Sequence, residues 1–214
     1  MLVLQADGEL MNKEREDRQF YTMLQPARER LQAFSTEDIC RRSGAVYDPG
    51  EKGFHLESLG EDIFISYPDF SVRGHVEKWQ QLTLLQYLYT ADGQELSGEW
   101  IDLSMMRGGL SRGESFHKEM EALSARSFSR VSAAEFLAAC RTLGGQEISG
   151  KADASAVIFY APRFPLCFNF WEADEEFPAS CRALADAGAD HYLGVEAAGG
   201  AAMAVLERIR NELR

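Results

Sequence analysis

The stretch that decides the fold is SAVIFYAPRFPLCFNFWEADEEFPAS, residues 155–180. It contains two short apolar segments, residues 155–162 and 165–173, rich in aromatic and aliphatic side chains. Segments of this length and composition predict two β-strands joined by a tight connection. In the second segment, both sets of alternating positions are largely apolar, so neither face of the strand is expected to meet water. The sequence therefore predicts that this strand lies centrally in its sheet.

The second apolar segment ends abruptly in four carboxylates, here called the acidic group: Glu172, Asp174, Glu175 and Glu176. Hard divalent cations bind carboxylate oxygens, and crowding without a cation raises carboxyl pKa values by repulsion. Asp186 and His191 follow closely and would complete a ligand set. The alternative is a solvated or helix-capping turn, since carboxylates ahead of a helix at Ala179 would favour its dipole. No DxDxDG or HExxH pattern decides between these readings.

The chain on the N-terminal side of these strands mixes helical and strand patterns. Helical spacing over residues 9–34 predicts an N-terminal helix that Pro26 should kink or split. Two-residue alternation over residues 45–72 predicts an antiparallel hairpin or three-stranded meander. Residues 76–93 then predict a helix of about four turns that ends at Gly93.

Capping patterns mark two further helices. Ser35 with Asp38 predicts the start of a short helix, and Ser132 with Glu135 predicts the start of a second one. Between them, the glycine- and arginine-bearing loop at residues 107–116 precedes another helical segment. Such a loop can present backbone N–H groups to an anion, but it matches neither the Walker pattern nor GxGxxG, and a plain connection is the alternative.

The alanine-rich remainder after Ser180 predicts helix to the C-terminus, with a break at Gly199 and Gly200. No internal repeat or low-complexity linker interrupts the chain. We therefore expect an N-terminal helical arm, residues 1–26, followed by a single α+β domain, residues 27–214, with an antiparallel or mixed sheet packed by helices.

Composition restricts the classes of partner and the compartment. The 214 residues are 45% hydrophobic, and the formal net charge of −12 argues against binding to nucleic acid or to anionic membranes. Apolar runs are far shorter than the ~20 residues that cross a bilayer, and the start lacks a secretory signal pattern. The four cysteines are widely spaced, which predicts free thiols, no iron–sulfur cluster and a cytoplasmic protein: Cys40, Cys140, Cys167 and Cys181.

Several pieces together carry a family resemblance: ICRRSGAVYD (39–48), LLQYLYTADGQELSGEWIDLSMMRGG (84–109), FPLCFNFWEADEEFPAS (164–180) and ALADAGADHYL (183–193). Over residues 27–210 the chain resembles domain of unknown function family 3786. The resemblance implies a small soluble protein typical of anaerobic bacteria and archaea, with some relatives attached to an iron–sulfur module or found near corrinoid and one-carbon metabolism. It implies no established activity. The chain departs from the family in lacking a cluster-binding cysteine set and in having Gln86 where histidine is expected; if that histidine functions in relatives, the function is altered or lost here.

Two classes of function follow. The first is a non-catalytic binding or accessory module that takes a protein partner or small-molecule ligand through a pocket beside Trp171. The second is a hydrolase or phosphoryl-transfer enzyme that uses a divalent cation held by the acidic group, with His191 as general base. We favour the module, because no catalytic constellation is recognisable. Arg163 is expected either in the pocket or paired with the acidic group. The candidate pocket residues are Trp171, Arg163, Trp100, Arg107, Gly108 and Gly109.

Overall fold

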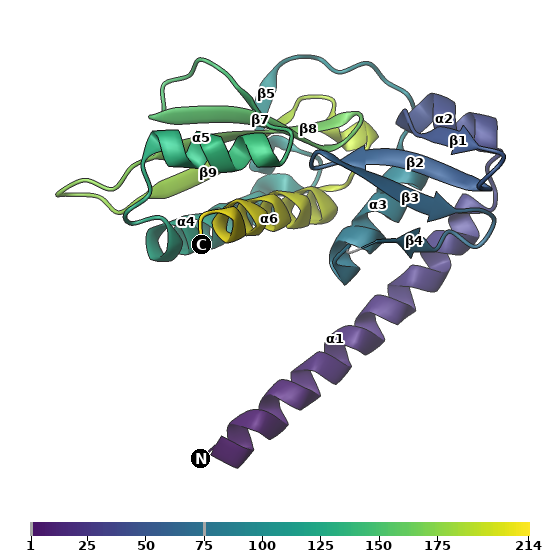
Figure 1. Ribbon diagram of the computed structural model, residues 1–214, viewed down its shortest axis with the longest axis horizontal. Coiled ribbons are helices and arrows are strands. Elements are labelled where there is room, and N and C mark those ends of the chain that lie inside the picture. Colours follow the sequence, from purple (N-terminus) through teal and green to yellow (C-terminus); the bar gives the residue numbers. More distant parts are fainter. Residues whose placement is uncertain (1, 75) are drawn as a thin grey trace.

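The larger of two sheets is built around the predicted central strand. The computed structural model describes residues 2–74 and 76–214, with side chains from Arg15 onward except those of His75 and Ser111. All neighbouring strands of this sheet are antiparallel, in the order β5-β9-β8-β7-β6. The strands are β5 (Trp100–Asp102), β6 (Gln146–Glu147), β7 (Ala154–Ala161), β8 (Phe164–Trp171) and β9 (Ser180–Asp186). The central place predicted for β8 is confirmed (Figure 1).

Helices cover one face of this sheet: α4 (Gly109–Ser127), α5 (Ala133–Thr142) and α6 (Val195–Glu212). Phe168 and Phe170 of β8 point into this layer and are fully buried. The ring of Phe170 stacks on Phe136 of α5 with centroids 4.4 Å apart. Burial of large aromatic side chains is the main favourable term in packing a helix onto a sheet, so this layer is the centre of the core.

A smaller sheet lies beside the larger one and has the order β1-β2-β3-β4, again antiparallel. Its strands are β1 (Val46–Asp48), β2 (Gly53–Ser58), β3 (Glu61–Ser66) and β4 (Val72–Arg73). The predicted meander is present, with a short fourth strand added. Helix α2 (Thr36–Ser43) precedes it; Ser35 accepts a hydrogen bond from the Asp38 N–H, as the capping pattern predicts.

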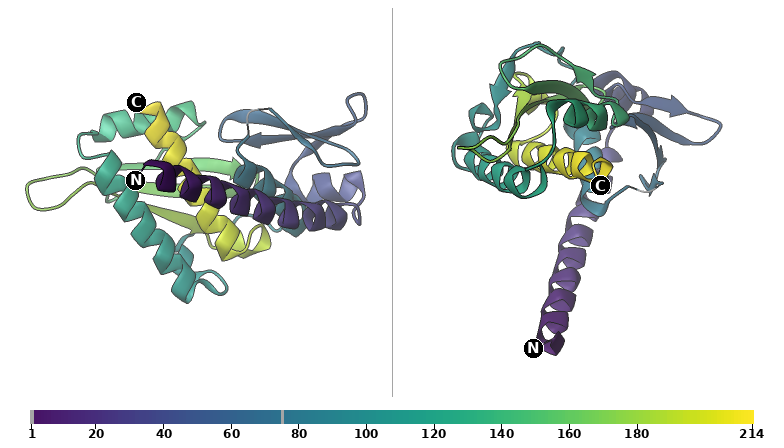
Figure 2. Two further views of the ribbon diagram at one scale, coloured as in Figure 1. Left: turned by 90° about the horizontal axis from the view of Figure 1, so that it is seen from below. Right: turned by 60° about the vertical axis from the view of Figure 1, so that its left-hand side comes forward.

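The two remaining helices pack on each other: α1 (Leu2–Leu31) and α3 (Lys78–Thr90). The predicted break at Pro26 is wrong, because α1 is continuous. Buried side chains on both sides of the proline, Phe20 and Leu31 among them, hold the helix and offset its lost hydrogen bond. The N-terminal half of α1 projects away from the rest of the molecule (Figures 1 and 2).

Two expectations for the C-terminal part are also wrong. A helix was expected at Ala179, but residues 180–186 form β9. The small residues Cys181, Ala183 and Ala185 alternate on its buried face, where the helices approach closely. Helix α6 also runs unbroken through the expected break at Gly199 and Gly200.

Close packing explains the first of these glycines and the early start of α4. The ring of Phe116, on α4, occupies the position that a Cβ on Gly199 would take, with ring atoms 2.1 Å from it. Helix α4 begins at Gly109, inside the segment expected to be a loop, because Gly109 and Gly113 lie directly on the backbone of the short 3-10 helix Leu103–Met105. Glycine here serves helix packing and not loop flexibility.

The two sheets meet at the end of the β2–β3 hairpin. The hydroxyl of Ser58 donates to the carbonyl oxygen of Tyr160 at 2.7 Å, and the N–H of Leu59 donates to the carbonyl oxygen of Phe159 at 3.1 Å. Gln80 of α3 donates to the Ser58 hydroxyl at 3.3 Å. These buried hydrogen bonds fix how the smaller sheet stands against β7.

Candidate functional site: a cleft between the two sheets

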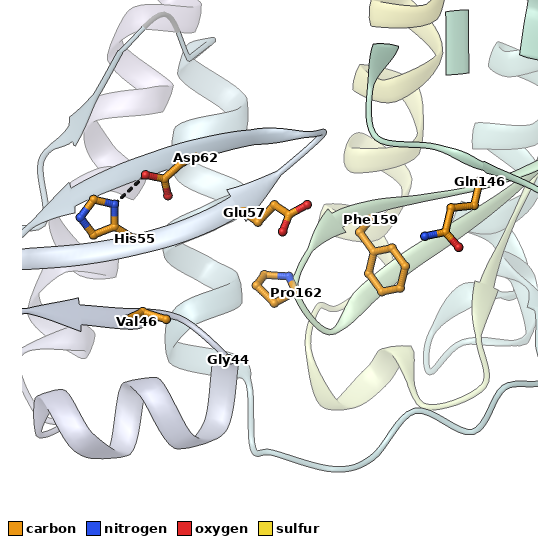
Figure 3. A pocket seen from close by; sticks show the side chains of 8 residues that line it. All are labelled: Gly44, Val46, His55, Glu57, Asp62, Gln146, Phe159 and Pro162. Carbon is orange, nitrogen blue, oxygen red and sulfur yellow. Dashed lines mark hydrogen bonds and ion pairs between the residues drawn. The ribbon is translucent and has the colours of Figure 1, made fainter. Parts of the chain in front are cut away.

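A cleft of about 510 Å³ lies where the outer face of the smaller sheet turns toward β7 (Figure 3). This volume falls in the range of small-molecule sites. The cleft is bounded by side chains and backbone from both sheets and from the turns beside them: Gly44, Val46, His55, Glu57, Asp62, Gln146, Phe159 and Pro162.

Strand alternation places the polar residues of the cleft. In β2, Phe54 and Leu56 are buried beneath the smaller sheet, so His55 and Glu57 lie on its outer face. The hairpin register sets Glu57 directly opposite Asp62 of β3. Two carboxylates and an imidazole thus share one face of one hairpin.

His55 and Asp62 form a close pair across the hairpin. Nδ1 of His55 lies 2.6 Å from Oδ2 of Asp62. Nε2 lies 3.9 Å from an oxygen of Glu51, too far for a hydrogen bond. The hydrogen bond to Asp62 raises the pKa of His55; the charges of Asp62, Glu51 and Asp48 add to it, while partial burial acts in the opposite direction.

Glu57 differs from Asp62 in having its carboxylate free. It is exposed on the cleft side of β2, and Figure 3 shows it directed into the space beside Pro162. Neither its carboxylate nor the side-chain amide of Gln146 forms a hydrogen bond or ion pair with the described residues. The polar wall therefore offers unused acceptors to a ligand.

The opposite wall is mostly apolar. Phe159, half-buried at the end of β7, and Pro162, in the turn that follows, lie across the cleft from Glu57, with Gln146 of β6 beside Phe159 (Figure 3). Val46 is 66% exposed at the rim. Gly44 closes the base with φ +79°, and a Cβ there would lie 3.2 Å from Cβ of Pro162, so this position requires glycine.

The acidic group predicted from the sequence lies in the β8–β9 connection, at the other end of the larger sheet. Glu172 caps α5 by accepting a hydrogen bond from the N–H of Ala133. Asp174 accepts hydrogen bonds from the N–H groups of Glu176 (2.8 Å) and Phe177 (2.7 Å), which lower the pKa of its carboxyl. Two of these carboxylates are thus used by backbone donors, Asp174 in an Asx turn within the connection and Glu172 as a cap on the start of α5.

Asp186 and His191 lie elsewhere. Asp186 ends β9, is 2% exposed and accepts hydrogen bonds from the N–H groups of Ser97, Gly98 and Gly188 at 2.8–3.0 Å. His191, in the 3-10 helix Ala189–His191, has Nδ1 2.6 Å from Oδ2 of Asp92. The length of β9, about 20 Å, separates them from the acidic group.

The predicted ligand set is therefore divided between two ends of the sheet. Among the side chains that the structure describes, no three from His, Cys, Asp or Glu are arranged to hold a metal ion.

The candidate pocket residues are also dispersed. Trp171 and Arg163 lie at opposite ends of β8, about 25 Å apart. The guanidinium of Arg163 donates to the carbonyl oxygen of Gly93 at 2.9 Å, so the pairing expected with the acidic group is wrong. Trp100 pairs with Asp186 in the β5–β9 register, near the Arg163 end and away from Trp171.

In the glycine- and arginine-bearing segment, the backbone N–H of Arg107, which could have bound an anion, already has a partner within the protein. The N–H of Arg107 donates to both carboxylate oxygens of Asp190, at 3.0 and 3.2 Å. Gly108, with φ +76°, is the N-cap of α4, and Gly109 is its first residue. The side chain of Arg107 lines a separate shallow hollow that also includes Gln86.

Sequence reasoning missed the His55–Asp62 pair and a second histidine contact. Nε2 of His117 lies 2.8 Å from Oδ1 of Asp102, whose other oxygen pairs with Arg182. Burial raises the pKa of Asp102, but hydrogen bonds from Ser104 and His117 outweigh it and hold that pKa well below its ordinary value. For His55, the available signal was the hairpin: folding β2 onto β3 about the turn at Gly60 brings residues 55 and 62 together.

The fold and the cleft define an α+β protein with a ligand-sized opening between two antiparallel sheets. A family model described as domain of unknown function DUF3786 matches residues 35–208, and the chain belongs to this family, as the sequence resemblance predicts. Comparisons with curated proteins and with solved structures returned no match. In the part of the chain that the structure describes, no helix combines the length and the apolar character needed to cross a membrane.

Proposed function

We propose that this protein is a non-catalytic binding module that holds a small ligand in the cleft between its two sheets. The observation that carries the proposal is the cleft itself: about 510 Å³, with unused polar groups on one wall and a mostly apolar wall opposite. Ligand sites in proteins are typically concave and largely apolar, with a few polar groups that orient the ligand.

Two features support binding over catalysis. The walls stand in a fixed relation, because buried hydrogen bonds from Ser58 and Leu59 tie the hairpin to β7. The lining contains a His–Asp pair, which is one part of a general-base arrangement, but no Ser, Thr, Cys or Lys side chain to act as a nucleophile. The ligand would thus meet preformed binding groups and no hydroxyl, thiol or amine that the His–Asp pair could activate.

For the compartment and the accessory role of the protein, the proposal keeps what we expect from the sequence. We place the protein in the cytoplasm, in keeping with its four free cysteines. An accessory role beside anaerobic iron–sulfur or corrinoid metabolism, which the family resemblance implies, stays a prediction.

The proposal is tested by a fragment screen, read out by amide NMR, on the wild-type chain, on a variant whose cleft is blocked and on a control variant. Val46→Trp adds bulk at the exposed rim without touching the core, and Leu110→Trp adds the same bulk on α4, where Leu110 is 87% exposed. Compounds that shift the amide signals of His55, Glu57 and Phe159 should lose binding in Val46→Trp and keep it in Leu110→Trp. Equal binding to both variants would contradict the proposal.

A further inference from the structure

Apart from His55, the ionisable side chains that line the cleft are carboxylates. Its lining includes the carboxylates of Glu57 and Asp62 and no lysine or arginine. Two guanidinium groups on adjoining elements have contacts of their own: Arg73 lies over the ring of Phe64 at 4.5 Å, and Arg163 donates to the carbonyl oxygen of Gly93. An anionic ligand would face the carboxylate of Glu57, which has no cationic partner among the described residues, while His55 is already paired with Asp62, and this like charge costs free energy.

The carboxylates on the smaller sheet have unused acceptor capacity, and the amide of Gln146 across the cleft is both donor and acceptor. Glu57 is an acceptor without a partner among the described residues, and only Oδ2 of Asp62 is used, by His55. Ionised carboxylates accept hydrogen bonds and donate none. The complementary group is one that only donates and carries positive charge, namely an ammonium or a guanidinium.

The apolar wall restricts the rest of the ligand. Phe159 and Pro162 stand across the cleft from Glu57 (Figure 3). A fully hydrated inorganic cation would leave this wall uncovered, whereas an aliphatic or aromatic body would bury it. The ring of Phe159 can also lie against a cationic group, because its face is electron-rich.

We propose that the cleft selects a small organic cation, with an ammonium or guanidinium group at Glu57 and Asp62 and an apolar or aromatic body against Phe159 and Pro162. This inference rests on the proposed binding function and adds the chemical class of ligand.

The experiment uses three probes that share one ring and differ in charge: benzamidine (cationic), benzamide (neutral) and benzoate (anionic). Each is titrated at constant pH and ionic strength into the full chain and into two variants, Glu57→Gln and Glu175→Gln, and amide NMR shifts are followed. Both variants remove one negative charge from an exposed side chain, but Glu175 lies in the acidic group at the other end of the sheet.

Benzamidine should shift the amide signals around residues 55–62 and 159 at lower concentration than benzamide, and benzoate should shift them least. Glu57→Gln should weaken benzamidine binding about fivefold, the size expected for a partly exposed charge pair, and Glu175→Gln should leave it unchanged.

The failures are distinguishable. Stronger binding of benzoate or benzamide at the cleft, or equal benzamidine binding to wild type and Glu57→Gln, would overturn the charge selection and leave the binding function standing. If none of the three probes shifts the cleft signals at millimolar concentration, both the charge selection and the proposed function fail.

Discussion

The acidic group and the cleft both contain carboxylates, but the hydrogen-bond partners of these carboxylates differ between the two regions. In the acidic group, Glu172 caps α5 and Asp174 accepts two backbone N–H groups. In the cleft, Glu57 faces open space with no partner among the described residues. A cluster of carboxylates is therefore a candidate site only where the backbone leaves its oxygens unused, and this depends on which elements lie opposite each side chain.

The largest effect should come from Asp186, which the sequence suggested as a cation ligand and the structure shows as a buried acceptor. Asp186→Ala leaves three N–H groups without their acceptor, so the free energy of unfolding should fall by about 3 kcal/mol. Urea denaturation measures this loss. Asp186→Asn keeps one acceptor oxygen and should lose less. A loss of stability that appears only when Mg²⁺ is present would instead support the prediction that Asp186 binds a cation.

Asp174 should show a smaller effect of the same kind. Asp174→Ala removes the acceptor of two exposed N–H groups and should lower the free energy of unfolding, by less than Asp186→Ala does, while Glu175→Ala should change it little. Because its hydrogen bonds lower the folded-state pKa of Asp174, this stabilisation is present above the unfolded pKa and is lost as pH falls through the folded one. Equal stability of the two variants would contradict a structural turn.

The sequence predicted the fold better than the site. The nearly continuous apolar run of β8 identified a central strand, because burial on both faces leaves a pattern within one segment. Strand β9 was missed because SCRALAD lacks β-branched residues, and its alternating small side chains reflect closely packed helices that a single segment does not reveal. The cleft was missed for a similar reason: His55 meets Asp62 only through hairpin register, and Phe159 comes from a strand about a hundred residues later.

The His55–Asp62 pair should show a modest effect. Asp62→Asn removes the hydrogen bond that chiefly raises the pKa of His55, so an NMR titration should find that pKa lower in the variant. Since the folded-state pKa is raised, the pair stabilises the protein below the unfolded pKa of histidine, and this contribution is lost as pH rises through the folded value. The same pKa in wild type and variant would show that the pair is not formed in solution.

Glu57 should show the smallest effect on stability. Because its carboxylate has no partner among the described residues, Glu57→Gln should change the free energy of unfolding by no more than about 0.5 kcal/mol, as measured by urea denaturation. A substantial loss would mean that Glu57 supports the fold, and the contrast with Asp186 would disappear.

The map of amide NMR shifts that benzamidine produces on the wild-type chain shows directly which region of the molecule binds. Shifts should gather at residues 44–46, 55–62, 146 and 159–161, which surround the cleft, and the signals of residues 171–180 should not change. Shifts gathered at residues 171–180 would contradict this prediction, because the acidic group would then be the part of the molecule that binds.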